Sequence, residues 1–362
     1  MSKTIDLEPN PQEGLKDALD RLMDAGGFAG VVSLGSTSGG AVDYLLVMKG
    51  QDISDLRPLH PVIPNQVGRL LRELTLRGPL KERLLVIARP CELRGFVEMV
   101  KRQQGDLTNM VFMSMVCSGA YSLSMAASGK VEGRSKEYWS SLGKGSLPDL
   151  RPACRVCTEF VPYTADLMVA PMEEGGWSLT ARSEEGSRII EAAFPETREG
   201  NVDQAVIAAM AEGRKANRPD VMGKEADVHG LADLVKVFGR CIGCHACSKA
   251  CPICYCTMCT FESARMEAKM EQVEAQLDVK GGVRVPTGTV LFHIGRMGHM
   301  AVSCVACGSC QDVCPTNIPV ALLFKKVGEA VQARFNYVPG RDVKERQPIN
   351  TFQPIEFKEM GK

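Results

Sequence analysis

The sequence predicts an α/β fold, with a mixed sheet in a large N-terminal domain and a smaller, cysteine-rich domain after it. Three observations lead to this prediction. Strand and helix patterns alternate through the N-terminal part, which is typical of an α/β domain. Seven of the 15 cysteines lie between residues 241 and 259, and four more lie between residues 304 and 314. The chain has 362 residues, enough for two or three domains.

The first elements are a helix and a hairpin. Residues 11–26 have apolar side chains at helical spacing and end at a glycine pair. Residues 27–34 and 41–48 have the apolar character of strands, and the turn-rich sequence between them predicts a hairpin. We therefore interpret the glycines of residues 35–40 as part of a turn and not as a phosphate-binding loop.

A helix, two buried strands and a second helix follow. Residues 65–78 predict a helix that is opened by an Asn cap at its first residue and closed by Gly. Residues 82–90 and 109–117 predict the strands, with a helix at 92–103 between them. Cys91 and Cys117 come at the ends of these strands. Ligands of parallel sheets bind beyond such strand ends, so we expect both cysteines near a site.

The remaining elements complete the predicted organisation. Residues 166–196 predict two strands and a helix, residues 203–216 an amphipathic helix, and residues 216–230 a linker. Helices are also expected at 261–279, between the two cysteine runs, and at 319–335. The tail is expected to be extended and docked on this chain or on a partner. The predicted domains are 1–225, 226–338 and the tail 339–362.

Composition excludes several classes of function. Lys plus Arg and Asp plus Glu both number 43, which removes the basic footprint of a nucleic-acid-binding protein. No apolar stretch of about 18 residues is present, so we expect no membrane span. The polar, acidic N-terminus lacks the apolar core of a signal peptide, and we expect a cytoplasmic protein. In such a chain, regularly spaced cysteines usually bind metal or carry out redox chemistry.

The pattern C-x2-C-x2-C-x3-C-P occurs twice with identical internal spacing, and the two copies start 63 residues apart. Three thiolates in such a loop bind one 4Fe-4S cluster, and the fourth cysteine of each motif binds the other cluster. The first predicted ligand set is Cys241, Cys244, Cys247 and Cys314. The second is Cys304, Cys307, Cys310 and Cys251. Disulfides and zinc explain the motif less well, because zinc ribbons use two separated C-x2-C pairs.

Three cysteines exceed that count: Cys254, Cys256 and Cys259. They are either packing thiols or ligands of a further metal site that a histidine, such as His293 or His299, would complete. His245 lies within the first motif, where we interpret it as a side chain that covers or tunes the cluster.

Several motifs in matching order resemble the beta subunits of deazaflavin-linked (coenzyme F420-type) formate dehydrogenases and hydrogenases, and formate dehydrogenase beta subunits most of all. They are ARPCELRG at 88–95, CRVCTEFVPYTADLMV at 154–169, CPICYCTMC at 251–259, the segment 292–327 and YVPGRDV at 337–343. The resemblance covers about residues 60–345. It implies an FAD-binding α/β domain with a 4Fe-4S cluster beside the flavin.

The four early cysteines fall at positions that the resemblance assigns to this third cluster: Cys91, Cys117, Cys154 and Cys157. The alternative is that they are buried core thiols. Loop-rich segments at 64–68, 89–94 and 175–178 are candidate surroundings of the flavin, with Arg89, Arg94 and Trp177 as candidate contacts. The chain has no G-x-G-x-x-G after a strand, so the sequence gives no support to NAD binding.

These observations favour an iron-sulfur flavoprotein that passes electrons between a flavin and 4Fe-4S clusters. The resemblance implies a separate catalytic formate dehydrogenase or hydrogenase subunit as partner, because the chain has no signature for molybdopterin or tungsten. A deazaflavin coenzyme or a heterodisulfide-reductase-like flavoprotein would exchange electrons with this chain as the second electron carrier. One alternative is a flavin-free polyferredoxin adaptor that serves as a scaffold. Another is a stand-alone flavoenzyme that reduces a small molecule.

Overall fold

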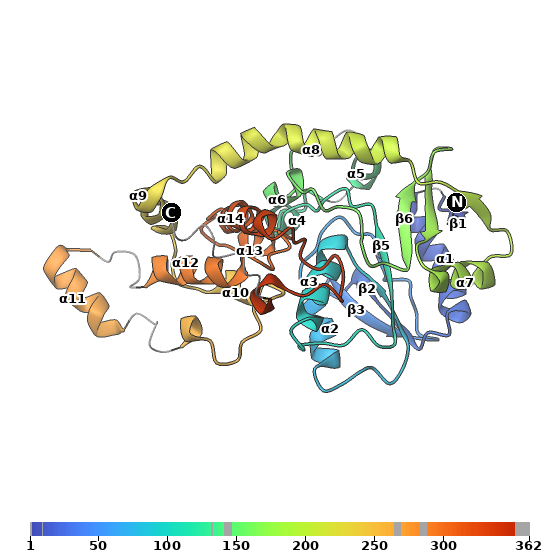
Figure 1. The fold of residues 1–362 in the computed structure, drawn as a ribbon, viewed down its shortest axis with the longest axis horizontal. Coiled ribbons are helices and arrows are strands. Elements are labelled where there is room, and N and C mark those ends of the chain that lie inside the picture. The colour runs from blue at the N-terminus through green and yellow to red at the C-terminus, as the bar shows by residue number, and fades with distance from the viewer. Residues whose placement is uncertain are drawn as a thin grey trace.

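The computed structural model describes residues 2–8, 10–131, 133–140, 147–263, 269–282 and 288–351. A mixed α/β unit occupies one end of the molecule and a set of helices and cysteine-bearing loops occupies the other (Figure 1). The long helix α8 (Gln204–Glu225) runs along one side and spans both parts. The predicted fold class, an α/β unit with a mixed sheet followed by a helical, cysteine-rich unit, is confirmed.

Eight strands form one sheet in the order β3-β2-β4-β5-β6-β7-β1-β8. Strands β2, β4, β5 and β6 are parallel neighbours, and the remaining pairings are antiparallel. The carboxyl ends of the four parallel strands therefore lie at one edge of the sheet. The early cysteines described below lie at this edge. The strand bounds are β1 Ser2–Asp6, β2 Gly30–Ser36, β3 Val42–Met48, β4 Leu84–Ile87, β5 Met110–Met115, β6 Leu167–Pro171, β7 Trp177–Ala181 and β8 Arg198–Gly200.

Helices cover both faces of this sheet. Helices α1 (Pro11–Ala25) and α7 (Glu184–Ala193) share one buried cluster with alternate strand residues such as Leu85. Helices α2 (Val67–Thr75) and α3 (Pro90–Val100) share the other cluster, to which the adjacent Leu84 belongs. This alternation follows from the period of two along a strand. Helices therefore cover both faces of the sheet, and the ends of its parallel strands are left for other elements to cover.

The cysteine-rich part is held by its own core. Phe238, Phe292 and Phe324, from three helices, pack in one buried cluster with several cysteines around it. The helices of this part are α9 Gly230–Phe238, α10 Ala246–Lys249, α11 Met270–Lys280, α12 Thr289–Met300, α13 Ser309–Asp312 and α14 Val320–Arg334, with 3-10 turns at Thr260–Glu262 and Pro348–Asn350. The short helices α4 Leu123–Ala127, α5 Ser135–Ser140 and α6 Pro152–Arg155 lie in the connection between β5 and β6.

Two local predictions are wrong. The predicted linker 216–230 is largely helix, because α8 continues through Pro219 to Glu225. Tertiary contacts offset the free-energy cost of a proline inside the helix, since Val221 is buried and Arg218 pairs with Glu329. The residue before α2 is Gln66, whose side chain makes no capping bond, so the predicted Asn cap is also wrong. Glu92 of α3 accepts a hydrogen bond from Val67 N instead, at 3.0 Å.

The helix predicted at 261–279 is shorter in the described residues. It occurs as α11 from Met270, while Thr260–Glu262 form a 3-10 turn and residues 264–268 lie outside the described part. The hairpin at 36–40 is confirmed by the antiparallel pairing of β2 with β3. The helices near residues 11–26 and 319–335 are confirmed as well.

The described part of the tail packs on α3, which is the first of the two predicted alternatives, docking on this chain or on a partner. Glu98 is fully buried and accepts hydrogen bonds from the Tyr337 hydroxyl, from Gly340 N at 2.9 Å and from Gln347 Nε2 at 2.8 Å. Arg102 Nη1 donates to the same carboxylate at 2.9 Å. One buried carboxylate thus fixes two points of the tail and Tyr337 just before it.

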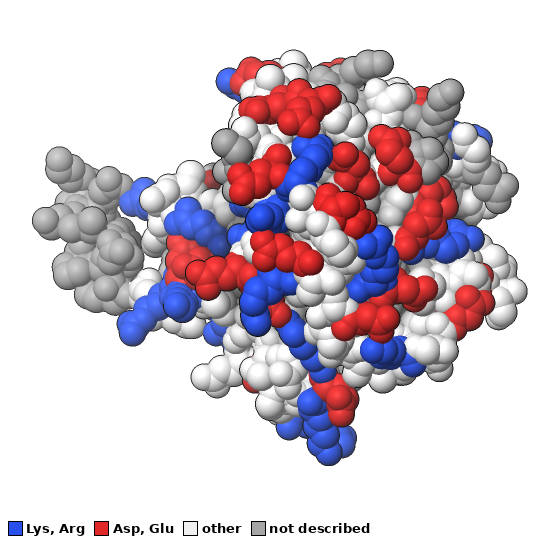
Figure 2. Space-filling view, turned by 90° about the vertical axis from the view of Figure 1, so that its right-hand side faces the viewer, with Lys and Arg blue, Asp and Glu red and all other residues white. Residues whose placement is uncertain are grey.

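No helix among the described residues has the length and apolar character needed to cross a membrane. On the face at the sheet end of the molecule, basic and acidic side chains are interspersed (Figure 2). This mixture agrees with the balanced composition of the whole chain.

Candidate metal centres

The four early cysteines line one cavity at the carboxyl edge of the parallel strands. We call Cys91, Cys117, Cys154 and Cys157 the strand-end site. Cys91 lies in the first turn of α3, Cys117 follows β5, and Cys154 and Cys157 lie in and after α6. A positive φ of 110° at Gly119 lets the chain pass close to Cys154, and a Cβ at Gly119 would lie 3.2 Å from the Cys154 Cβ. Thiols far apart in sequence are therefore brought together.

A buried arginine stands beside the strand-end site. Arg89 Nη1 lies 3.1 Å from Cys117 Sγ and also donates to Gly119 O at 2.8 Å. Burial raises the pKa of the Cys91 thiol well above its ordinary value and that of Cys154 to about 11. Buried thiols of this kind ionise readily only when a cation or a metal compensates their charge. The donor set and its buried cation suit a thiolate-bound metal cluster.

Four further cysteines line a second cavity, which we call the middle site: Cys251, Cys304, Cys307 and Cys310. Cys251 comes from the first motif and the other three come from the second, so cysteines of both motifs line this cavity. Ala306 and Gly308 have φ values of 53° and 85°, which turn the loop around the cavity. Burial raises the pKa of Cys304 to about 11.

The outer site comprises Cys241, Cys244, Cys247 and Cys314. Burial raises the pKa of Cys247 to about 11, and the other three thiols of the set raise it further while Arg296 lowers it. Arg296 Nη1 lies 3.1 Å from Cys247 Sγ. Two backbone amides, Gly243 N and Ile318 N, donate to the sulfurs of Cys241 and Cys314, each at 3.4 Å. Cys244 is exposed, so this site reaches the surface.

Two histidines lie near the outer site, and His293 contacts one of its sulfurs. His293 Nε2 lies 3.4 Å from Cys241 Sγ, and the ring stacks on Phe238 with centroids 4.1 Å apart. His245 stacks on Phe292 at 4.3 Å. Burial lowers the pKa of His293 to about 4, so this ring is neutral at physiological pH.

The three sites form a continuous series. Ala306 and Cys307 line both the strand-end cavity and the middle cavity. The charge of Cys307 also acts on Cys91, and that of Cys247 acts on Cys310 of the middle site. The order is therefore strand-end, middle, outer, and it ends at the exposed Cys244.

The three surplus cysteines line another cavity, next to the middle site. Cys254 Sγ lies 3.7 Å from Arg296 Nη2 and 3.9 Å from Met300 Sδ. Hydrogen bonding with Cys251 lowers the pKa of Cys254. His299 packs against Phe261 with ring centroids 5.5 Å apart. Among the described residues, no group of three or more His, Cys, Asp or Glu side chains is close enough to hold a single metal ion.

The three candidate flavin contacts do not converge. Arg89 donates hydrogen bonds to groups of this chain around Cys117, as described above. Arg94 donates to Val305 O at 2.9 Å on the side of the middle site. Trp177 packs edge-to-face on Trp139, with centroids 5.2 Å apart. Trp139 in turn contacts Tyr138 at 5.0 Å, so these aromatic rings pack on one another.

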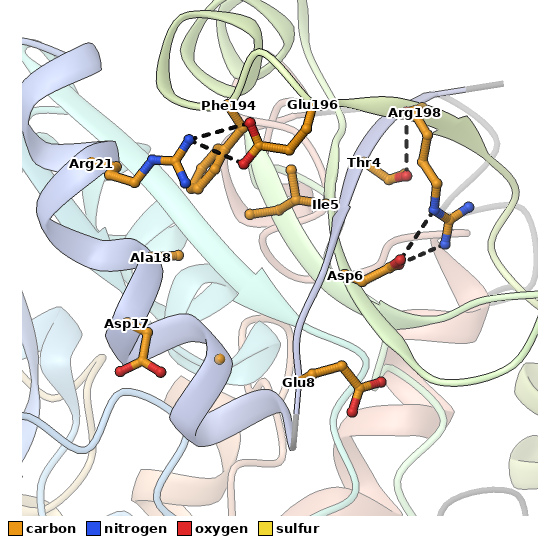
Figure 3. Close-up of a pocket in the computed structure, with 11 residues that line it drawn as sticks. Thr4, Ile5, Asp6, Glu8, Asp17, Ala18, Arg21, Phe194, Glu196 and Arg198 are labelled. Carbon is orange, nitrogen blue, oxygen red and sulfur yellow. Dashed lines mark hydrogen bonds and ion pairs between the residues drawn. The ribbon is translucent and has the colours of Figure 1, made fainter.

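A separate cavity of about 400 Å³ lies between β1, α1 and the segment around β8, away from the cysteines (Figure 3). Its basic groups are paired with carboxylates: Arg21 with Glu196 at 3.1 Å and Arg198 with Asp6 at 2.6 Å. Glu8 and Asp17 add further acidic groups. A cavity with this surplus of carboxylates is a poor site for an anionic cofactor.

Comparisons with known proteins agree with both parts of the chain. The model of a 4Fe-4S dicluster domain matches residues 238–318. The model for the C terminus of the coenzyme F420 hydrogenase/dehydrogenase beta subunit matches residues 127–199. The F420-dependent formate dehydrogenase subunit beta of Methanocaldococcus jannaschii is 25% identical over 348 residues, covering 83% of this chain and 88% of that protein. The F420-dependent formate dehydrogenase 1 subunit beta of Methanococcus maripaludis is 25% identical over 357 residues, covering 84% and 87%.

Proposed function

Because the chain belongs to the family of F420-dependent formate dehydrogenase and hydrogenase beta subunits, we propose that it conducts electrons through three 4Fe-4S clusters within a multisubunit oxidoreductase. The ligands would be the twelve cysteines of the strand-end, middle and outer sites. Each cubane carries one electron at a time, and its potential depends on burial and on hydrogen bonds to sulfur. The chain would therefore serve as a relay with a buried end and an exposed end.

The observation that carries this proposal is the shared wall of two cavities. Cys307 and Ala306 belong to both the strand-end and the middle cavity, and Cys247 acts on Cys310 across the next boundary. Clusters held there would be neighbours, as electron transfer between them requires. Separate cavities without shared residues would support three unrelated structural centres instead.

The relatives are each named as one subunit of a formate dehydrogenase, which indicates the kind of partner this chain would have. We propose that a catalytic subunit oxidises formate or hydrogen and exchanges electrons with this chain. A deazaflavin coenzyme or a heterodisulfide-reductase-like flavoprotein would be the second electron carrier. The exposed Cys244 supports the outer site as one point of contact with a partner.

A flavin would supply the exchange between two-electron and one-electron chemistry. The residues at the strand ends do not fit its ring well. Arg89 is bonded to protein atoms, including the Tyr138 hydroxyl at 2.9 Å, and the rings of Tyr138, Trp139 and Trp177 pack on one another. The cavity beside the middle site fits better, because the buried Nε atoms of Arg72 and Arg296, which line it, have no partner in the described part of the chain.

The packed aromatic rings at the strand ends favour one alternative, a flavin-free polyferredoxin adaptor. Anaerobic purification of the intact complex distinguishes the two. The relay proposal expects about twelve irons per chain, bound flavin and a co-purifying catalytic subunit. Twelve irons without flavin would favour the adaptor, and about eight irons would remove the strand-end cluster.

A further inference from the structure

Strand β3 forms one edge of the sheet and has unused backbone groups. It pairs with β2 on one side, and no other described strand lies beyond it. Lys49 N donates to Ala29 O at 2.8 Å, so the odd-numbered residues of β3 form hydrogen bonds with β2. The N–H and C=O groups of the even-numbered residues therefore point away from the sheet. An open edge of this kind is a template for pairing with another chain.

The outward amides near the middle of β3 differ in their partners. Tyr44 N donates to the Asp43 carboxylate and Met48 N to the Gln51 side chain, each at 2.8 Å. Between them, the outward N–H and C=O of Leu46 have no hydrogen-bond partner among the described residues. The two side-chain contacts are local, so a neighbouring strand can replace them with main-chain hydrogen bonds.

The side chains along this edge are apolar and partly uncovered. Leu46 is 42% exposed and Met48 is 40% exposed. They lie on the same face of the sheet as Tyr44, which packs against the buried cluster of α2 and α3. Apolar side chains beside unpaired backbone groups indicate that this edge is a contact surface for another strand.

The charges at the two ends of β3 indicate which strand this is. Asp43 lies at the start of the strand, and Lys49 directly follows its last residue. When two copies of β3 pair in antiparallel orientation about Leu46, Asp43 of each copy lies opposite Lys49 of the other. Tyr44 then lies opposite Met48, and Leu46 lies opposite its own copy. A contact of this kind has two-fold symmetry, and each complementary pair occurs twice.

Both charges are available for such a pair. Lys49 Nζ lies 2.7 Å from Asp24, but both side chains are more than half exposed, and surface pairs of this kind contribute little to stability. Asp43 accepts hydrogen bonds from Tyr44 N and from Asn65 Nδ2, and it has no cationic partner among the described residues. Directly opposite residues of unlike charge stabilise an antiparallel strand pair.

We propose that β3 joins two copies of this chain by antiparallel pairing centred on Leu46, which merges their sheets into one. Leu46 N–H of each copy donates to Leu46 C=O of the other, and the exposed side chains of Leu46 and Met48 are covered. The dimer goes beyond the proposed relay. None of the predicted cluster ligands lies in β3, so the exposed Cys244 stays open to a redox partner.

Exchange of the two charges tests the proposal on the anaerobically purified, cluster-loaded chain. Sedimentation velocity over a concentration series should show a monomer–dimer equilibrium for the wild type. Asp43→Lys alone and Lys49→Asp alone each place like charges opposite one another twice per dimer. Each should weaken dimerisation at least about tenfold. The double variant Asp43→Lys/Lys49→Asp restores both complementary pairs and should dimerise like the wild type.

A mixture of the two single variants makes the test specific to this register. Every lysine at the interface then faces an aspartate, so an equimolar mixture of Asp43→Lys and Lys49→Asp should form dimers that neither variant forms alone. Glu212→Lys is the matched control, since the Glu212 side chain is 75% exposed on α8. This variant should dimerise like the wild type.

A second set of measurements does not depend on charge. Amide hydrogen exchange of residues 42–48 should be slower at concentrations where the dimer forms than at concentrations where the monomer dominates. Leu46→Pro removes the central outward N–H and spares the bonds of the odd-numbered residues to β2, because an edge strand tolerates proline on its open side. This variant should stay monomeric and keep about twelve irons.

A wild-type chain that stays monomeric at its highest soluble concentration would overturn the proposal. Single variants that dimerise like the wild type, or a mixture that fails to associate, would overturn it as well. So would an intact complex with one copy of this chain in which another subunit protects β3. None of these results would alter the three-cluster relay, whereas loss of the strand-end cluster with normal dimerisation would contradict the relay alone.

Discussion

Arg94 Nη2 donates a hydrogen bond of 2.9 Å to the carbonyl oxygen of Val305. This bond joins the helix that begins beside Cys91 to the loop between Cys304 and Cys307. The two elements also approach closely nearby, since a Cβ at Gly95 would lie 3.3 Å from a ring carbon of Pro252. The α/β part and the cysteine-rich part are thereby held in one fixed relation, which sets the spacing of the strand-end and middle sites.

Replacing Arg94 with Ala should slow electron transfer between these two sites. The change removes a buried, charge-assisted bond worth about 1.5–3 kcal/mol and leaves the Val305 carbonyl without its partner. We expect a severalfold lower rate of internal transfer after rapid partial reduction, with unchanged iron content. Arg77→Ala serves as the surface control. An unchanged rate in folded Arg94→Ala would show that the bond does not set the spacing.

Cys154→Ser should remove one cluster and spare the other two. Iron should fall from about twelve to about eight per chain, because only the strand-end site loses a thiolate. Cys256→Ser is the matched control and should keep all twelve. If Cys256→Ser also lost iron, a surplus cysteine would be a ligand and the assignment would need revision.

Arg296→Leu should lower the reduction potential of the outer cluster. The guanidinium lies 3.1 Å from Cys247 Sγ, and both its charge and its N–H favour the reduced, more negative cluster. A loss of about 1.4 kcal/mol corresponds to about 59 mV for one electron. A redox titration followed by EPR measures the shift. A potential that rises, or a strand-end potential that shifts equally, would contradict this role.

Glu98→Gln should release the tail from α3. The pH dependence of tail docking should also become weaker in this variant. Burial works to raise the pKa of Glu98, but the hydrogen bonds from Tyr337 and Arg102 and the charge of Lys101 hold it below the ordinary value. A carboxyl group with a lowered folded pKa stabilises the protein above its unfolded pKa, near about 4.3, and this contribution is lost as pH falls.

Limited proteolysis measures the release. Wild-type protein should resist cleavage in residues 339–351 at pH 7 and become more sensitive as the pH approaches 4. Glu98→Gln should be sensitive already at pH 7, with a smaller change on acidification. Equal resistance of both proteins at pH 7 would show that the tail is held by other contacts.

Spacing in the sequence predicts that Cys251 joins Cys304, Cys307 and Cys310, and these four cysteines line one cavity in the structure. Cysteines two and three residues apart in a loop have few ways to surround a cluster, so Cys251 could be assigned to the second set from the motif alone. The strand-end rule places Cys91 and Cys117 near a site, whereas grouping them with Cys154 needs the family resemblance, because nothing in their local sequence links them. The parallel strands were predictable for a similar reason, since their apolar runs are distinctive.

Other features depend on tertiary contacts and left no local signal. Arg296 lies in α12, a helix that the sequence pattern did not indicate, and its position beside Cys247 follows from packing of Phe292 and Phe324. Arg214 similarly donates to the Cys117 carbonyl from the middle of α8, at 2.6 Å. Strand β1 joins the sheet by pairing with β7, and β8 pairs with β1 at the edge, which short polar segments do not predict.

The number of interacting clusters per chain tests the central claim most directly. EPR spin quantification of the fully reduced, anaerobically purified protein should give about three spins per chain, with line broadening from magnetic coupling between neighbours. The same sample should contain about twelve irons. About two spins, or three spins without coupling, would contradict a continuous relay from the strand-end site to Cys244.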